Sequence, residues 1–130
     1  MARTSILVVL AAGLALAAPA LSANPKRIAS YCSTTGDVCY GVFRQGETFQ
    51  LQLTTAARYF GRYTICSKPP ARAATCKSFP LRKRGQSFGG VVLFQRNFPH
   101  TVPGKYKMTW KLGAQPLGPA LKFTYLPIVP

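Results

Sequence analysis

Short runs in which apolar and polar residues alternate recur along most of the chain, separated by Gly and Pro. The clearest run spans residues 105–112, where Tyr106, Met108, Trp110 and Leu112 alternate with lysine or threonine. Because successive side chains of a strand point to opposite faces, this pattern predicts a strand with one buried and one solvated face. By the same criterion, further strands are expected at residues 28–33, 38–44, 48–54, 58–66, 75–81, 88–95 and 120–125.

The predicted strand at residues 58–66 carries an aromatic residue between two cations. Its alternation places Tyr59 and Tyr63 on the buried side, and Arg58, Phe60 and Arg62 on the outer side. An exposed Phe60 between two guanidinium groups would stack on a base or a sugar ring.

These seven or eight strands, with no convincing amphipathic helix among them, predict an all-β fold. The expected architecture is a small antiparallel β-sandwich of two packed sheets, and a small closed barrel is the main alternative. Pro80 interrupts the run at 75–81 and so favours a sheet edge for it. The run at 88–95 is apolar on both faces at residues 91–94, which is typical of a central strand.

One local pattern bears on the type of sandwich. Residues 103–110 read PGKYKMTW, which resembles the G-x-Y approach to the penultimate strand of immunoglobulin-like domains. The resemblance implies an immunoglobulin-like architecture in which Tyr106 closes a corner by hydrogen-bonding to upstream backbone. The chain departs from antibody domains, since no Cys lies two residues after Tyr106 and no Cys/Trp/Cys arrangement is evident.

The N-terminal segment has the composition of an export signal. Arg3 precedes an unbroken apolar run at residues 6–18, and small residues follow at 19–23. As a helix this run extends about 20 Å, which is too short for a hydrocarbon core about 30 Å thick. We therefore expect residues 1–23 to be a cleaved signal peptide and 24–130 to form one domain, secreted or on the periplasmic or outer side of the cell envelope. No later segment is long and apolar enough to cross a membrane.

Export would place the four cysteines in an oxidising compartment, where they form disulfides. Four cysteines allow three pairings. The local pairing, Cys32 with Cys39 and Cys66 with Cys76, is favoured because each pair brackets turn-forming residues. A zinc site is disfavoured, since neither spacing matches the short pairs of zinc ligands and His100 is the single histidine. Neither a metal nor a cofactor is expected.

Positive charge dominates the composition. The 130 residues hold 17 Lys and Arg against two Asp and Glu, a net charge of +15, and loss of the leader removes only Arg3 from this set. Most cations therefore lack an acidic partner, and such a surface attracts polyanions in a salt-dependent manner. The residues expected to contact an anionic partner fall in three groups: Arg58, Phe60 and Arg62; Arg82, Lys83 and Arg84, expected in a turn; and Lys105, Lys107, Lys111 and Lys122.

The favoured hypothesis is a non-enzymatic, exported binding or envelope-associated module. Its partner would be an anionic polymer or acidic surface, such as a cell-envelope polyanion, a polysaccharide or nucleic acid. The first alternative is a specific protein-interaction module, an inhibitor or adhesin, that uses the loops at residues 67–75 and 97–104.

The second alternative is a small cationic ribonuclease. Glu47 would act as base and His100 as acid, and Arg58, Arg62 or Arg96 would stabilise phosphate charge. No motif supports this reading, so no catalytic residue is assigned. Residues 85–89 match G-x-S-x-G, but no acid follows Ser87 and a nucleophile elbow is therefore excluded.

Overall fold

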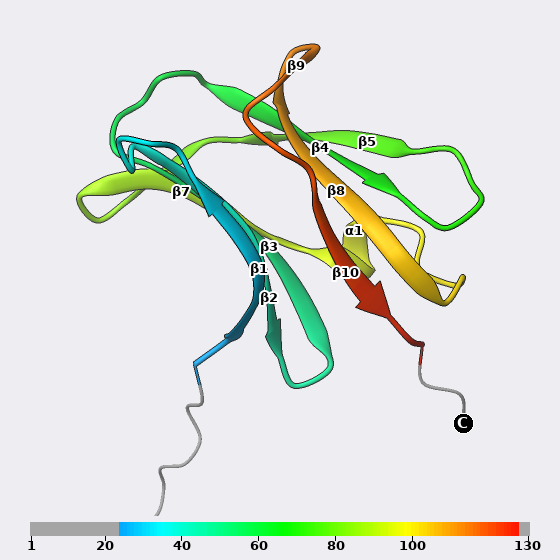
Figure 1. Cartoon of the computed structure of the whole chain (residues 1–130). Helices are drawn as coiled ribbons and strands as arrows, with labels where there is room; N and C mark the ends of the chain where they lie inside the picture. The colour runs from blue at the N-terminus through cyan, green and yellow to red at the C-terminus, as the bar shows by residue number, and fades with distance from the viewer. Residues whose placement is uncertain (1–23, 128–130) are drawn as a thin grey trace, which may run out of the picture.

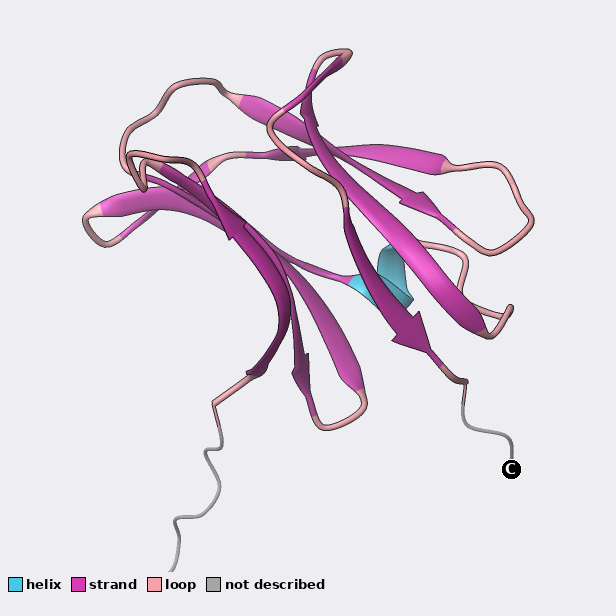
Figure 2. Ribbon diagram, in the orientation of Figure 1, coloured by secondary structure: helices cyan, strands magenta, loops and turns pink. Residues whose placement is uncertain are grey.

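The computed structural model describes residues 24–127, and the expected signal peptide at 1–23 lies outside them. Two antiparallel β-sheets pack face to face, which confirms the all-β sandwich (Figures 1 and 2). The first sheet contains, in spatial order, β1 (Lys26–Cys32), β2 (Val38–Gln45), β3 (Thr48–Thr55), β7 (Ser87–Leu93) and β6 (Arg82–Arg84). The second contains β10 (Leu121–Tyr125), β8 (Gly104–Leu112), β4 (Arg62–Lys68) and β5 (Thr75–Pro80), with the short β9 (Gln115–Pro116) beside β8.

The core forms between the sheets from the residues that the alternation selects. Tyr106, Met108 and Trp110 of β8 are fully buried, and they face Leu51 and Leu53 of β3, which are equally buried. The alternation of β8 is therefore confirmed at these positions. Leu112 departs from it and is 43 % exposed, because it lies at the end of β8 beside the hairpin to β9 rather than between the sheets.

The prediction for residues 58–66 is wrong in its first half. The chain crosses from the first sheet to the second between β3 and β4, so Arg58 and Phe60 lie in the connecting loop and share no strand face with Arg62. Tyr59, expected inside, is 52 % exposed. Phe60, expected outside, is partly buried against the core. Tyr63, within β4, is buried as predicted.

A second crossing accounts for the position of Arg82, Lys83 and Arg84. Leu81 is buried between β5 and β6, and its N–H donates to the Gly61 carbonyl at 2.9 Å. The three basic residues then form the edge strand β6 instead of the predicted turn. The turn itself is Gly85–Gln86, where Gly85 takes a φ of +64° that favours glycine.

The predicted strand at 88–95 ends two residues early. Phe94 begins a single helical turn, α1 (Phe94–Asn97), which the Phe98 N–H closes by donating to the Phe94 carbonyl at 3.0 Å. Phe94 is fully buried, and its ring contacts the aromatic rings of Phe49, Phe98, His100, Tyr106, Phe123 and Tyr125. This helical turn therefore places Phe94 in an aromatic cluster that closes one end of the sandwich.

The corner before β8 has the contact that the Tyr106 pattern implies. The Tyr106 hydroxyl donates to the Val102 carbonyl at 2.5 Å, four residues upstream. Burial raises the pKa of Tyr106 above its ordinary value, because the phenolate would lose its hydration.

Both disulfides join the cysteines that the local pairing predicts. Cys32 bonds to Cys39 and Cys66 to Cys76, and each pair lies directly opposite across two neighbouring strands. The bridges therefore tie β1 to β2 and β4 to β5.

Replacing Cys66 and Cys76 together by alanine is expected to lower the free energy of unfolding by about 2.5 kcal/mol, because the unfolded chain regains the entropy of an open loop. Urea unfolding followed by circular dichroism measures the change. The Cys32→Ala/Cys39→Ala variant, with a shorter separation of 7 residues, should lose slightly less. An unchanged midpoint in both variants would contradict the stabilising role of the bridges.

Alkaline pH should destabilise the fold through its buried tyrosines. Burial raises the pKa of Tyr63 from 10.0 to about 12, an effect that the positive charge of Arg84 partly opposes. Between these values the unfolded state releases the Tyr63 proton while the folded state retains it, so the free energy of unfolding falls as pH rises. Urea titrations at successive pH values test this. Tyr63→Phe should show a shallower fall, and an identical fall in both proteins would count against the assignment.

Candidate anion-binding face and end pocket

Five lysines gather on the outer side of the second sheet. Lys105, Lys107 and Lys111 of β8 point away from the core, since they alternate with its buried side chains. Lys122 of β10 and Lys68 of β4 alternate with buried residues in the same way. We call this surface, formed by Lys68, Lys105, Lys107, Lys111 and Lys122, the lysine face.

Strand register brings three of these lysines into one row. Lys107 lies directly opposite Lys122 on one side and directly opposite Lys68 on the other. Neighbouring strands are about 4.8 Å apart, so the row extends over about 10 Å. Like charges placed directly opposite one another destabilise a sheet. Sheet stability therefore does not account for the row.

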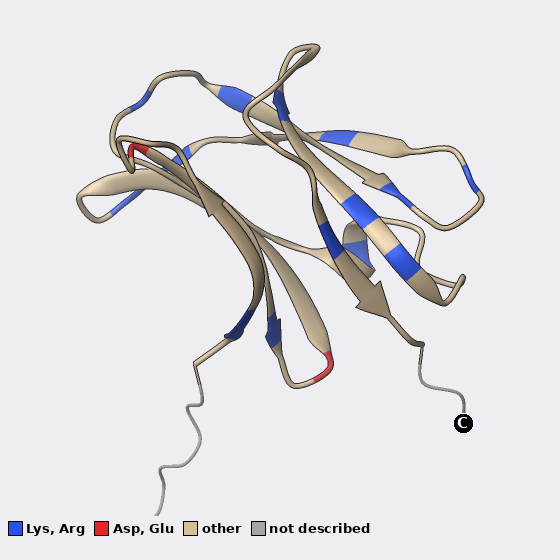
Figure 3. Cartoon of the chain, viewed as in Figure 1, with Lys and Arg blue, Asp and Glu red and all other residues tan. Residues whose placement is uncertain are grey.

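The lysine face has no acidic neighbours within the described chain. The two acidic residues of the described chain, Asp37 and Glu47, lie in the β1–β2 and β2–β3 turns of the first sheet. Figure 3 shows no red among the blue segments of β4, β8 and β10. In residues 24–127, the side chains of Lys105, Lys107 and Lys122 have neither an ion pair nor a hydrogen bond. Their ammonium groups are free to bind a ligand.

Two cations at the margin of this face, Lys68 and Arg62, make hydrogen bonds within the protein. Lys68 donates from Nζ to the carbonyls of Pro69 at 3.3 Å and Arg72 at 2.6 Å, so it also holds the β4–β5 loop. Arg62 points to the same side, and its guanidinium donates to the hydroxyl and the carbonyl of Ser78. The sequence prediction grouped the four lysines of β8 and β10 correctly, but it missed Lys68, which only the register of β4 with β8 brings beside them.

The other predicted cations lie elsewhere. Arg82, Lys83 and Arg84 are exposed on β6, at the far edge of the first sheet. The guanidinium carbon of Arg58 lies 5.1 Å from the centre of the Phe88 ring, and Phe88 is the strand partner of Lys83. Because Phe60 packs against the core, the predicted stack of Phe60 on a base or sugar lacks an exposed ring.

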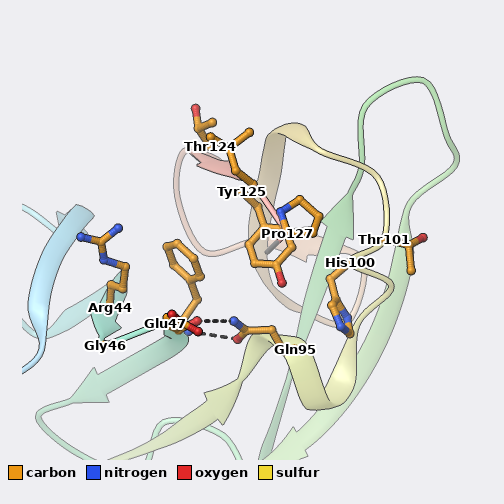
Figure 4. Close-up of a pocket in the computed structure, with 11 residues that line it drawn as sticks. Arg44, Gly46, Glu47, Gln95, His100, Thr101, Thr124, Tyr125 and Pro127 are labelled. Carbon is orange, nitrogen blue, oxygen red and sulfur yellow. Dashed lines mark hydrogen bonds between the residues drawn. The ribbon is translucent and has the colours of Figure 1, made fainter. Parts of the chain in front are cut away.

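A pocket opens at the end of the sandwich, where the β2–β3 turn, α1 and the end of β10 meet (Figure 4). Its volume is about 680 Å³, within the range of small-molecule sites. Glu47 and His100, the acid–base pair of the ribonuclease hypothesis, both line it. The cation in its wall is Arg44, and none of Arg58, Arg62 and Arg96 lines it.

Two side chains of this end pocket, Gln95 and His100, are engaged in hydrogen bonds to backbone atoms. Gln95 lies between Glu47 and His100 in Figure 4, and its amide accepts from the Phe49 N–H at 3.0 Å and donates to the Glu47 carbonyl at 2.6 Å. Gln95 thus holds the turn in place. His100 Nδ1 lies 2.9 Å from the Phe98 carbonyl. A carbonyl only accepts, so Nδ1 carries a proton and donates in this contact.

The loops at 67–75 and 97–104 meet at one place. A Cβ on Gly104 would lie 2.9 Å from Pro70 Cγ, and Gly104 takes a φ of +129° that side chains rarely adopt. Glycine at position 104 therefore permits the close approach of the two loops.

Within residues 24–127, no three His, Cys, Asp or Glu side chains are grouped so that they could hold a metal ion. The described helix, α1, is far too short to cross a membrane. Comparisons with models of known protein families, with curated proteins and with solved structures find no match for this chain.

Proposed function

We propose that the protein is an exported, non-enzymatic module that binds anionic polymers through the lysine face. The observation that carries the proposal is the row of Lys68, Lys107 and Lys122 on three adjacent strands, with no acid beside it. The two disulfides indicate an oxidising compartment. We propose that residues 1–23 direct export of the protein out of the cytosol.

The surroundings of the lysines bear on selectivity. The row is flanked on the same side of the sheet by Thr109 and Thr124 and by the Cys66–Cys76 bridge, which offer neither an aromatic platform nor a planar amide. Such a surface binds negatively charged groups and does not distinguish one base or sugar from another. We therefore expect binding to several polyanions with similar affinity at equal charge density.

Retention on heparin and phosphocellulose resins across a salt series tests the proposal. The protein should bind both resins at physiological ionic strength and elute at a higher salt concentration, with log K falling linearly against log salt. Elution below physiological ionic strength from both resins would overturn it. An acidic protein partner that is retained at high salt would favour the protein-interaction alternative instead.

We also propose that the sandwich is immunoglobulin-like. Two observations support the assignment. The order β2-β3-β7-β6 opposite β5-β4-β8-β10 corresponds to strands A, B, E and D opposite C′, C, F and G of that architecture. Tyr106, at the start of the strand that corresponds to F, makes the corner hydrogen bond to Val102.

A second candidate function, the ribonuclease, gains one specific observation. Glu47 and His100, 53 positions apart in the sequence, line the same end pocket together with Arg44. Glu47 would take the proton of a ribose 2′-hydroxyl, His100 would protonate the leaving oxygen, and Arg44 would stabilise the phosphorane charge. Incubating the purified protein with a fluorogenic RNA tests this candidate. Cleavage that Glu47→Gln or His100→Gln abolishes would establish it, and no cleavage by the wild-type protein would exclude it.

A further inference from the structure

A second basic surface lies on the opposite layer of the sandwich. Lys83 is paired with Phe88, which packs against the core, so Lys83 belongs to the inner side of the sheet edge. Arg82 and Arg84 alternate with it and are paired with Gly89 and Ser87. By strand alternation Arg82 points to the outer side of the first sheet. Arg84, the last residue of β6, lies near enough to the interior for its charge to act on the buried Tyr63. We call Arg82, Lys83 and Arg84 the β6 patch.

The lysine face and the β6 patch point in different directions. The lysine face lies on the outer side of the second sheet, the β6 patch lies along the free edge of the first sheet, and the two layers are about 10 Å apart. In Figure 3 the blue segments of β8 and β10 lie on one side of the molecule, and those of the hairpin before β7 lie on the other. One straight polyanion chain therefore cannot contact both surfaces at once.

The two surfaces belong to sheets that are joined by a short buried connection. β5 of the second sheet continues into β6 of the first through a single residue, Leu81, which is buried and hydrogen-bonded to Gly61. All three side chains of the β6 patch are exposed. Asp37 and Glu47 form no ion pair with them in residues 24–127, and β2, which both acids flank, is separated from β6 by two strands. Each surface thus keeps its own uncompensated charge.

We propose that the protein bridges two anionic chains, one bound to the lysine face and one to the β6 patch. This inference rests on the proposed function, since it requires that the lysine face bind a polyanion. Bridging adds a cross-linking function: once one chain is bound, a second chain is held at a high effective concentration beside it. The expected products are networks of polyanion and protein instead of chains that are merely coated.

A two-step capture assay tests bridging. The protein is bound to a heparin-coated surface at low salt, the excess is washed away, and a short fluorescent heparin fragment is added. The wild-type protein should capture the fragment. Two variants with equal net charge, Arg82→Gln/Lys83→Gln/Arg84→Gln and Lys105→Gln/Lys107→Gln/Lys122→Gln, each keep one surface. Both should bind the coated surface and capture at least about tenfold less fragment.

A control variant separates the two surfaces from net charge. Lys26→Gln/Arg27→Gln/Arg96→Gln also removes three positive charges, but from other places in the fold. This variant should capture nearly as much fragment as the wild-type protein. An equal loss in this control, or full capture by both the β6-patch variant and the lysine-face variant, would overturn the assignment. Wild-type protein that binds the coated surface but captures nothing would overturn bridging and leave the proposed function standing. Failure to bind the coated surface would overturn both.

Discussion

Replacing Lys105, Lys107 and Lys122 with glutamine is expected to weaken binding to a double-stranded DNA oligomer about 100-fold at physiological salt. DNA serves here as a polyanion of known charge density. Each lysine that no longer contacts a phosphate flattens the slope of log K against log salt by about 0.9. The slope of the triple variant should therefore be smaller by about three.

Fluorescence anisotropy across a salt series measures both quantities. The matched control is the Lys26→Gln/Arg27→Gln/Arg96→Gln variant, which has the same net charge but keeps the lysine face. It should bind close to wild-type affinity. Equal weakening in the two variants would show that total charge, and not the arrangement on β8 and β10, determines affinity.

The second large effect concerns stability. Phe94→Ala is expected to lower the free energy of unfolding by about 3–5 kcal/mol, because Phe94 is fully buried and its loss leaves a cavity. Its ring is surrounded by six other aromatic rings from β3, β8, β10 and the loop after α1. These rings come from both sheets, so neighbouring side chains cannot all move to fill the space.

Urea unfolding measures this effect, and Phe43 offers a comparison. Phe43 is half-buried on the outer side of β2, so Phe43→Ala should lose clearly less stability. A loss below about 1 kcal/mol in Phe94→Ala would contradict the view that the aromatic cluster closes this end of the sandwich.

The high charge and the small core explain why the two bridges matter. Mutual repulsion among unpaired cations destabilises a compact chain. A sandwich of this size buries a limited apolar area, and each local disulfide offsets part of that deficit by restricting the unfolded state. The bridge between Cys66 and Cys76 lies on the same side of the sheet as the lysine face, where β4 and β5 are held together beneath the charges.

The sequence predicts strands well where alternation is regular, and fails where the chain changes sheets. In β8 every second side chain is buried through Trp110, because the strand lies wholly over the core. At residues 58–61 the alternation continues in the sequence, but the chain there spans the gap between layers, so exposure depends on loop geometry. The pattern places Phe94 in a strand for a related reason: a short apolar run fits a strand or a helical turn equally well.

For the candidate sites too, the sequence predicts what lies within one strand and misses what depends on packing between distant segments. Lys105, Lys107 and Lys111 belong to one strand, so period two is sufficient to place them together. The addition of Lys68 needs the register between strands about 40 residues apart, which no local pattern encodes. The end pocket likewise joins Arg44 and Glu47 of the β2–β3 hairpin to His100, which is 53 positions beyond Glu47, and no local pattern predicts that approach.

The most direct test of the account is a titration of ¹⁵N-labelled protein with a short sulfated oligosaccharide, followed by amide chemical shifts. Binding at the lysine face predicts the largest shifts on the three adjacent strands β4, β8 and β10, centred on Lys68, Lys107 and Lys122. Shifts that concentrate instead on Arg44, Glu47 and His100 around the end pocket, or no shifts at physiological salt, would contradict it.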